Sequence, residues 1–302
     1  MQDHHVIVGA GPVGREIAAQ LTGRGSRVTV VTRSGATVPG AASAALDASD
    51  EAALLAVTEG AAAIHNCANP PYTSWARDWP PLAASLLAVA ERSGALLAIT
   101  GNLYPYGPVD EPMRESMPDA ATDTKGRVRA RMWADARAAH EAGRVRAVEV
   151  RGSDYVGSGV GDNGVLTRLV PAALKGRSVW TLGRADLPHS WTDVRDVART
   201  QIALADRPDL GGRLWHVPTN APRSQQEALD DVLASVGKPS VRVRSIPHGV
   251  VRAAGAVVPM MRELAETNYQ RMRPYVLDSS ETQRVLGISP TPWDEVCRRT
   301  AG

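Results

Sequence analysis

The chain has 302 residues, of which 43% are apolar and 22% are charged, and its formal net charge is +2. This composition is typical of a globular protein and argues against a disordered chain. The basic residues are spread along the sequence without forming a block, so nucleic acid is not an expected partner. Cys67 and Cys297 are the only cysteines and lie far apart, which disfavours a disulfide framework or a metal cluster.

A few polar residues lead directly into the first apolar segment, which leaves no room for a signal peptide. No apolar run approaches the roughly 18 residues of a membrane span. We therefore expect a cytoplasmic protein that acts on a small molecule, without a membrane or a metal among its partners.

In the first half of the chain, short apolar runs alternate with longer amphipathic segments, which is the pattern of βα units in a parallel sheet. The expected strands are His5–Val8, Arg27–Thr32, Ala62–Asn66, Ala95–Thr100 and Val145–Val150. The expected helices are Pro12–Arg24, Glu51–Val57, Trp75–Arg92 and Thr124–Ala142. Right-handed crossovers would place these helices on both faces of the sheet, so the sequence predicts an α/β, Rossmann-type doubly wound fold.

Beyond residue 151 several glycines interrupt the chain and the pattern becomes mixed. The segments expected there are helices at Val165–Leu174, Val194–Ala205 and Ser224–Val236, strands at Gly211–Val217 and Val241–Ile246, and mostly helix up to Thr282–Leu286. We expect residues 1–150, completed by 179–218, to form an NAD(P)-binding Rossmann domain. Residues 151–178 and 219–302 would form a smaller, mixed C-terminal substrate lobe.

A glycine-rich loop, Gly9-Ala10-Gly11-Pro12-Val13-Gly14, follows the first expected strand and has the pattern GxGxxG. Gly9 permits the tight turn, Gly11 lets the backbone approach a pyrophosphate, and Gly14 allows the helix to pack closely on the strand. The expected helix begins with Pro12 and Val13, and the free N–H groups at this end would point at the anion. The loop therefore predicts dinucleotide binding; the alternative is a turn that only joins strand and helix.

The second expected strand ends at Thr32-Arg33-Ser34, where an NAD enzyme usually carries an acid for the ribose 2′-hydroxyl. Arg33 can instead bind a 2′-phosphate bidentately, and Ser34 adds a hydroxyl donor. The sequence therefore favours NADP as the cofactor, with NAD possible. The alternative for Arg33 is a solvated surface arginine.

Further segments follow the order of extended short-chain dehydrogenases/reductases, the superfamily of nucleotide-sugar epimerases and dehydratases. Asp47-Ala48-Ser49-Asp50 resembles the family's element that meets adenine, and His65-Asn66-Cys67-Ala68-Asn69 resembles the end of its fourth strand, beside the cofactor. The segments 102–107, 151–157 and 193–198 resemble three later family motifs. The resemblance implies that Asp47, Ala68 and Asn69 contact the cofactor, and it implies a possible homodimer.

The resemblance does not extend to the family's catalytic Tyr-x-x-x-Lys motif. Lys125 falls at the tyrosine, Arg129 at the lysine, and Asn102 at the family's catalytic serine. The isoflavone-reductase-like members of the superfamily carry a lysine in the tyrosine's role, so Lys125, if desolvated beside Arg129, would serve as general acid or base. Asn102 would then hydrogen-bond a substrate oxygen. The alternative is that the Lys/Arg run is the solvated face of a helix.

Tyr104 and Tyr106 offer a second source of the acid, since both lie in the loop over the expected active site; packing in a Pro-bracketed turn is the alternative. A third possibility is that the fold kept its cofactor and lost its reaction, which would leave a non-catalytic NADP-binding regulator. Redox-neutral lyase or isomerase chemistry on the same fold is also open.

Asp154 lies where the family often places an asparagine that faces the substrate, and a carboxylate there would repel anions; capping the glycine-rich loop is the alternative. His189, closely followed by Trp191, falls where sugar-nucleotide enzymes commonly place an arginine for the diphosphate, and a neutral histidine binds phosphate poorly. Tyr269 lies in the C-terminal lobe, which in proteins of this family usually closes over the substrate. The glycine-rich loop, the retained substrate-loop segments and the polar residues at the reactive positions together predict an NADP-dependent oxidoreductase or epimerase-like enzyme. Its substrate would be a small, non-phosphorylated carbonyl compound or secondary alcohol.

Three other side chains carry weaker predictions. Trp75 and Trp79 could wall the pocket beside the nicotinamide, but aromatic residues that open a helix are more often part of the core. Cys67 lies near the cofactor by position, yet no base is identifiable for it, so a nucleophilic role lacks support.

Overall fold

The computed structural model describes residues 3–246, 249–250 and 259–302, and the chain divides into two compact units. Unit 1 comprises Met1–Asn102, Arg127–Arg151 and Val197–Trp215; unit 2 comprises Leu103–Gly126, Gly152–Asp196 and His216–Gly302. Residues 103–126, 179–196 and 216–218, which the sequence assigned to the nucleotide-binding part, thus fall in unit 2. The first of these segments is the loop that leaves a central strand, and the second packs into the apolar core of unit 2.

Unit 1 is organised around a seven-stranded sheet with the order β10-β6-β5-β4-β1-β2-β3. Its strands are β1 His4–Val8, β2 Arg27–Thr32, β3 Ala42–Ala45, β4 Ala63–Asn66, β5 Leu96–Asn102, β6 Arg146–Gly152 and β10 Leu214–His216. The pairs from β5 across to β3 are parallel; Val6 of β1, for example, lies opposite Thr29 of β2 and Ile64 of β4. The strand order reverses between β1 and β4, and ligands of such sheets bind outside the carboxyl ends of the strands at that reversal.

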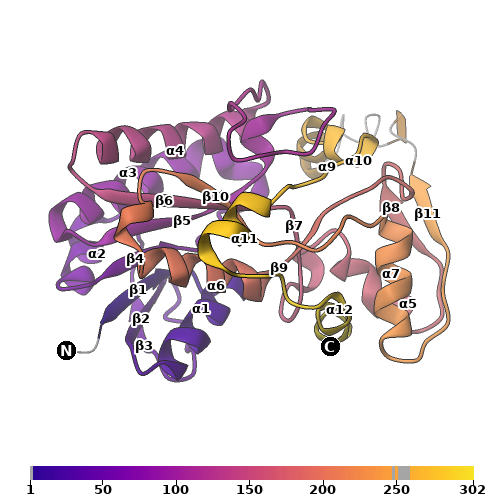
Figure 1. Ribbon diagram of the computed structural model, residues 1–302, viewed down its shortest axis with the longest axis horizontal. Helices are drawn as coiled ribbons and strands as arrows, with labels where there is room; N and C mark the ends of the chain where they lie inside the picture. Colours follow the sequence, from indigo (N-terminus) through magenta and orange to yellow (C-terminus); the bar gives the residue numbers. More distant parts are fainter. Residues whose placement is uncertain (1–2, 247–248, 251–258) are drawn as a thin grey trace. The chain divides into compact units, whose positions relative to one another are not determined.

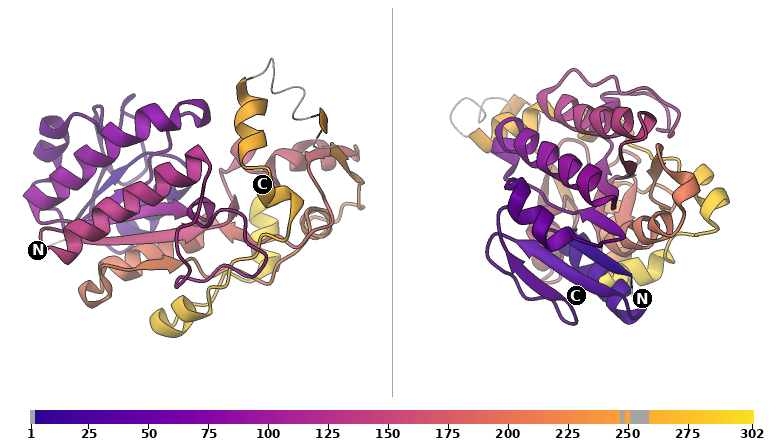
Figure 2. Two further views of the ribbon diagram at one scale, coloured as in Figure 1. Left: turned by 90° about the horizontal axis from the view of Figure 1, so that it is seen from above. Right: turned by 90° about the vertical axis from the view of Figure 1, so that its left-hand side faces the viewer.

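Helices cover both faces of this sheet: α1 Pro12–Gly23, α2 Glu51–Thr58, α3 Trp75–Ser93, α4 Thr124–Glu141 and α6 Val194–Ala205. Figure 1 shows α3 and α4 on one side of the sheet and α1 and α6 on the other, and Figure 2 shows α3 and α4 side by side. The predicted doubly wound α/β fold is confirmed.

A chain of hydrogen bonds crosses the interior of unit 1. His5 Nδ1 lies 3.1 Å from His65 Nε2, and His65 Nδ1 lies 3.0 Å from Gln201 Oε1. Gln201 Nε2 donates to Thr100 Oγ1 at 2.7 Å, and that hydroxyl donates to Cys67 Sγ at 3.6 Å. The amide oxygen of Gln201 only accepts, so every donor in the chain points toward Cys67. These buried polar groups stabilise the fold because they satisfy one another.

Unit 2 contains two small parallel sheets and several short helices. Its strands are β7 Asp154–Val156 with β9 Trp191–Asp193, and β8 Val179–Leu182 with β11 Val243–Ile246. Its helices are α5 Val170–Ala173, α7 Gln225–Ala234, α9 Pro259–Glu266, α10 Tyr269–Met272, α11 Ser280–Leu286 and α12 Trp293–Ala301. The expected mixture of short strands and helices is thus found, but unit 2 is not the smaller of the two units.

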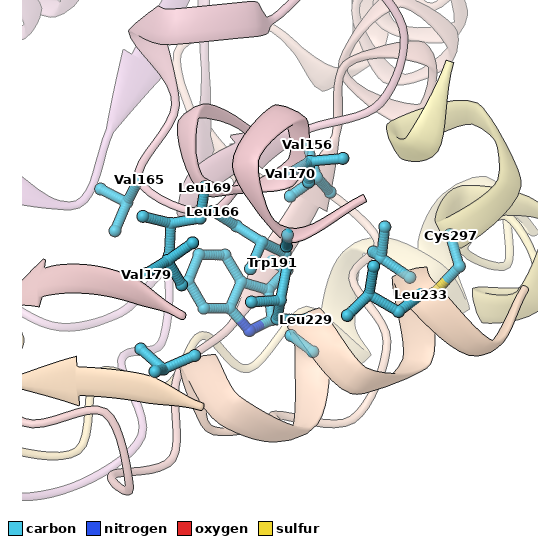
Figure 3. Close-up of a cluster of buried hydrophobic side chains, with 14 of the residues drawn as sticks. Val156, Val165, Leu166, Leu169, Val170, Val179, Trp191, Leu229, Leu233 and Cys297 are labelled. Carbon is cyan, nitrogen blue, oxygen red and sulfur yellow. The ribbon is translucent and has the colours of Figure 1, made fainter. Parts of the chain in front are cut away.

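Trp191 lies among the apolar side chains that form the core of unit 2 (Figure 3). Its neighbours in this cluster include Val156, Leu166, Leu229 and Cys297. The indole N–H donates to the Arg223 carbonyl at 2.9 Å, so the buried ring leaves no polar atom unsatisfied. Trp191, expected at the substrate, is thus a core residue.

Several local predictions were wrong in extent. The helix expected over Val165–Leu174 is only a 3-10 turn at Thr167–Leu169 followed by α5, because Pro171 lacks the N–H that a continuous α-helix would need there. The strands β3, β7, β8 and β9 were not expected, nor was the helix α12. Within the described residues, no helix is both long and apolar enough to cross a membrane.

Candidate active site

The glycine-rich loop joins the carboxyl end of β1 to α1, and its first and last glycines are needed for packing. Gly9 has a φ of +108°, and a Cβ on it would lie 2.7 Å from the Cys67 carbonyl oxygen. A Cβ on Gly14 would lie only 2.0 Å from the Gly9 carbonyl oxygen. Any other residue at either position would collide with backbone, so the loop is held tightly between β1, β4 and α1.

Gly11 differs from these two glycines because a Cβ placed on it would have nothing within 4 Å. Gly11 is also the residue from which α1 starts, with Pro12 at its first position, and no described side chain caps this helix end. The first N–H groups of α1 are therefore available to an anion in open space beside Gly11. The loop thus fits the pyrophosphate of a dinucleotide.

Arg33 and Ser34 lie exposed directly after β2. Asp47 accepts hydrogen bonds from the Ser49 hydroxyl at 2.7 Å and the Ser49 N–H at 2.9 Å. These bonds, with a smaller contribution from Arg33, lower the pKa of Asp47. Arg33 thus has an accessible guanidinium, whereas Asp47 organises the turn before α2.

The segment after β4 is fixed by its own side chains. Asn66 Oδ1 accepts the Ala68 N–H at 3.2 Å, and the exposed Asn69 follows. Burial raises the pKa of Cys67 to about 12, and only the Thr100 hydroxyl opposes this effect. Cys67 is therefore a thiol at neutral pH, in keeping with the absence of a nucleophilic role in the sequence interpretation.

Arg129 lies buried on α4 and is held by unit 1. Its Nη1 donates to the Thr100 carbonyl at 3.1 Å, and its guanidinium lies 4.3 Å from the ring centre of Trp79 and 4.9 Å from that of Trp75. Cation–π contacts of this kind are strong when they are desolvated. Both tryptophans are buried, and their rings hold the Arg129 guanidinium in place. Asn102 closes β5, two residues after Thr100.

Lys125 lies in the first turn of α4, where it is almost completely buried. Its ammonium pairs with Glu263 and, at 3.3 Å, with Glu266, both on α9. Glu266 also accepts the Thr124 N–H. In unit 2, Lys125 thus contacts two carboxylates, and its role as general acid or base stays a prediction.

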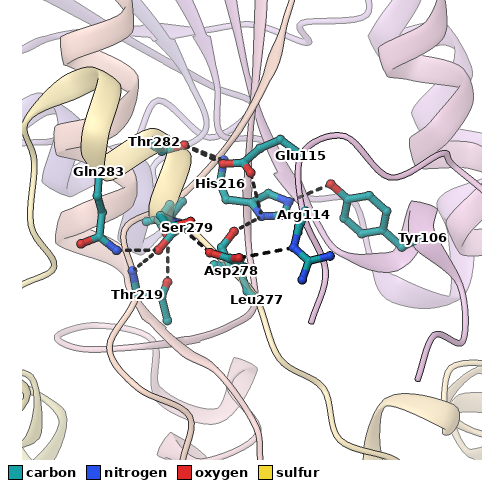
Figure 4. A network of polar contacts seen from close by, with 12 residues as sticks. Tyr106, Arg114, Glu115, His216, Thr219, Leu277, Asp278, Ser279, Thr282 and Gln283 are labelled. Carbon is teal, nitrogen blue, oxygen red and sulfur yellow. Dashed lines mark hydrogen bonds and ion pairs between the residues drawn. The ribbon is translucent and has the colours of Figure 1, made fainter. Parts of the chain in front are cut away.

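The turn Tyr104–Tyr106 packs directly against the start of α4. A Cβ on Gly126 would lie 2.7 Å from the Tyr104 carbonyl oxygen, so only glycine fits there. Tyr106 is buried and its hydroxyl lies 2.7 Å from His216 Nε2 (Figure 4). His216 Nδ1 lies 2.8 Å from the Asp278 carbonyl, which can only accept, so in the neutral ring Nε2 accepts the hydrogen bond of the tyrosine hydroxyl. Tyr106 is therefore committed to a structural bond, and Tyr104 remains the candidate of the pair.

The helix α10 carries three consecutive residues whose polar atoms are buried without a hydrogen-bond partner among the described residues. These atoms are the Tyr269 hydroxyl, both amide atoms of Gln270, and Nε and Nη1 of Arg271. Burial, followed by Asp123 and Tyr104, raises the pKa of Tyr269, which is therefore a neutral phenol. Buried polar groups without partners cost stability, and their concentration in one short helix is typical of a ligand site.

Asp154 and His189 form the second polar cluster of unit 2. His189 Nε2 lies 2.8 Å from Asp154 Oδ2, and the side chains are 5% and 17% exposed. Burial raises the pKa of Asp154, but His189, Arg271 and Arg168 together outweigh it and leave the pKa below its usual value. Burial and the charge of Arg271 lower the pKa of Arg168, which places both cations in this cluster.

The family model of NAD dependent epimerases/dehydratases matches residues 5–217. The chain belongs to this family. No curated protein matches it in sequence.

Solved structures of epimerases and dehydratases share the fold. A UDP-glucose 4-epimerase from Brucella ovis in complex with NAD is 18% identical, with a TM-score of 0.78 over 99% of this chain and 97% of that one. A dTDP-glucose 4,6-dehydratase from Bacillus anthracis in complex with NAD is 13% identical, with a TM-score of 0.80 over 99% and 95%. A UDP-glucose 4-epimerase from Bifidobacterium longum in complex with NAD+ and UDP is 17% identical, with a TM-score of 0.79 over 99% and 97%.

In this epimerase/dehydratase chain, the expected cofactor residues follow the carboxyl ends of β1, β2 and β4, except Asp47, which follows β3. Tyr104, Lys125 and Tyr269 belong to one cluster of unit 2, and Asp154 and His189 belong to another. Sequence reasoning missed Arg168, Gln270 and Arg271. No motif marks them, and their polar groups come together with Asp154 or lie buried without a described partner only in the folded chain.

Proposed function

We propose that the chain is an NADP-dependent oxidoreductase or epimerase-like enzyme that acts on a carbonyl or secondary alcohol of a small molecule with an anionic group. The observation that carries this proposal is the open space beside Gly11 at the start of α1, in a chain of the epimerase/dehydratase family. Gly9, Gly11 and Gly14 would hold the pyrophosphate, and Arg33 with Ser34 would hold the 2′-phosphate. The bound cofactor supplies hydride transfer.

The anionic group of the substrate is a change from the sequence interpretation, which took Asp154 as a repelling charge. Arg168 and Arg271 lie in electrostatic contact with Asp154, and their two positive charges exceed its single negative charge. The Arg271 donors that have no partner among the described residues would then pair with phosphate or carboxylate oxygens of the substrate. The related structures contain UDP or act on nucleotide-linked glucose, which makes such compounds the first to test.

Turnover is tested with purified protein, NADP+ or NAD+, and a panel that pairs UDP-glucose and dTDP-glucose with unphosphorylated sugars and simple alcohols. The proposal expects conversion of an anionic member and none of its neutral counterpart. Mass spectrometry of the products is included, because an epimerisation or another redox-neutral conversion leaves the cofactor unchanged overall. Turnover of the neutral members alone would exclude the anion-binding part of the proposal.

The cofactor preference is tested with Arg33→Gln and, as a matched control, the exposed Arg177→Gln. Loss of a charge-assisted bond to the 2′-phosphate would weaken NADP+ binding about tenfold to a hundredfold. NAD+ affinity would change little in either variant. Equal affinity of the wild type for NAD+ and NADP+ would contradict the assignment.

A non-catalytic NADP-binding regulator is the second candidate, and one observation favours it. Lys125 and Arg129, the residues at the two positions of the family's catalytic pair, are both engaged by neighbouring side chains or backbone. A regulator would bind NADP+ and NADPH with similar affinity and would convert no member of the panel. Any hydride-accepting substrate excludes this candidate.

A further inference from the structure

Two loops of unit 1 start side by side at the carboxyl ends of β1 and β2. The two strands pair in parallel, with Val8 opposite Val31, and the Gly9 N–H donates to the Val31 carbonyl at 2.9 Å. The glycine-rich loop therefore begins beside residues 33–41, which follow β2 and which we call the β2 loop. In Rossmann-type domains, the ribose 2′-position of a bound dinucleotide lies beside the end of the second strand.

The β2 loop is fixed by its own contacts with unit 1. The Thr32 hydroxyl accepts the Ala36 N–H at 2.8 Å, and Val38 is buried. Gly40 has a φ of +76°, and a Cβ on it would lie 3.2 Å from Thr22 Cβ of α1. The loop thus presents its backbone carbonyls in fixed positions beside α1.

Arg15 connects the two loops. It lies exposed in the first turn of α1, and its Nε donates to the Ala10 carbonyl of the glycine-rich loop at 3.0 Å. Its Nη1 donates to the Thr37 carbonyl of the β2 loop at 3.4 Å. Both acceptors are neutral, and Nη2 has no partner in the part of the chain that the structure describes. Because a guanidinium has five N–H donors, Arg15 keeps donors and its full charge for an anion.

Arg33, the first residue of the β2 loop, has different surroundings. It lies in electrostatic contact with the carboxylates of Asp47 and Asp78, which offset part of its charge. Among the described residues, no carboxylate pairs with Arg15. A phosphate monoester carries close to two negative charges at neutral pH, so a partly offset Arg33 would not neutralise it alone. Arg15 contacts the same loop and can supply the second positive charge.

We propose that Arg15 is a second specificity-determining residue for NADP, which pairs with the 2′-phosphate from the glycine-rich loop while Arg33 pairs with it from the β2 loop. The inference rests on the proposed function, in particular on its choice of NADP. Both arginines and both loops belong to unit 1. NAD carries a neutral hydroxyl at the same ribose position, so Arg15 adds little to the binding of NAD.

The first test is calorimetric titration of Arg15→Gln with NADP+ and with NAD+. The control is Arg27→Gln, because the exposed Arg27 lies at the opposite end of β2 from Arg33. NADP+ affinity should fall about tenfold in Arg15→Gln and stay unchanged in the control, and NAD+ affinity should change little in both. An unchanged NADP+ affinity would overturn the inference. So would an equal loss for the two cofactors, because a residue that only joins the loops would give that result.

The same titrations separate this inference from the proposed function. A wild type that binds NAD+ and NADP+ equally would contradict the proposed cofactor, and the inference would fail with it. A wild-type preference for NADP+ that is lost in Arg33→Gln but kept in full in Arg15→Gln would overturn the inference alone. Loss of the preference in both variants supports the pairing of the 2′-phosphate with two arginines.

A second measurement reports direct contact with the phosphate. The ³¹P resonance of the 2′-phosphate in bound NADP+, followed against pH, gives its second pKa, which is about 6 for a free phosphate monoester. A guanidinium in contact favours the dianion and lowers this pKa. The pKa should therefore lie below that of free NADP+ in the wild type and in Arg27→Gln, and rise toward it in Arg15→Gln. The same pKa in the wild type and in Arg15→Gln would overturn the inference.

Discussion

The glycine-rich loop of unit 1 and the polar cluster of unit 2 around Asp154, His189 and Arg271 present two different kinds of binding surface. The loop offers backbone N–H groups and open space, and it is continuous in sequence. The cluster offers buried side chains from separate elements, several of them without partners among the described residues. Unit 1 also buries polar side chains, but His65, Gln201 and Thr100 satisfy one another. Unsatisfied polar groups, more than buried ones, therefore mark the ligand site.

The largest effect is expected from Gly14→Ala. A Cβ there would lie 2.0 Å from the Gly9 carbonyl, so backbone must move, and we expect a loss of about 3 kcal/mol or more in the free energy of unfolding. Gly23→Ala in the same helix is the control, since its Cβ meets nothing within 4 Å. Urea denaturation of both variants measures the difference. Equal stability would mean that the loop is not held as tightly as described.

Low pH should lower the stability of unit 1 because of its buried histidines. Burial, and then the charge of His5, lower the pKa of His65 from 6.5 to about 3. The folded state therefore keeps the imidazole neutral while the unfolded chain takes up a proton, so stability falls as the pH drops from about 6.5 toward about 3. The slope is about 1.4 kcal/mol for each pH unit. Urea denaturation at several pH values should show a smaller slope in His65→Gln, and an identical slope would refute this explanation.

The variant Arg271→Met tests whether the polar cluster of unit 2 binds a ligand or serves the fold. Two donors of Arg271 have no partner in the part of the chain that the structure describes. If they bind a ligand, their removal would leave stability unchanged or raise it by about 1 kcal/mol. Binding of inorganic pyrophosphate, measured by calorimetry, would weaken about tenfold or more. A large loss of stability with unchanged pyrophosphate affinity would show that Arg271 serves the fold.

The smallest effect is expected from Tyr106→Phe. This variant removes one buried hydrogen bond, to His216, and should cost about 1 kcal/mol of stability. Thermal unfolding measures the loss, and NADP+ affinity should not change. A change in affinity would mean that the turn Tyr104–Tyr106 contributes to cofactor binding.

The sequence predicted the fold of unit 1 well because its signals are local. The β-branched run of β2 and the glycine spacing after β1 each lie within one short segment. The strands β3, β7, β8 and β9 were missed. A strand of three or four residues, such as Ala42–Ala45, is too short to show the alternation of apolar and polar residues. The polar cluster of unit 2 could be predicted only in part. Asp154 and His189 matched family positions, but Arg168 and Arg271 meet them only through tertiary packing.

The central claim is that the open space beside Gly11 binds a nicotinamide dinucleotide. Isothermal titration calorimetry of the wild type and of Gly11→Ala with NADP+ tests it most directly. A Cβ at Gly11 would have no described atom within 4 Å, so the substitution should leave the fold intact. The account predicts saturable binding to the wild type and a loss of at least about tenfold in the equally stable Gly11→Ala. Absence of binding to the wild type, or equal affinity in the two proteins, would contradict it.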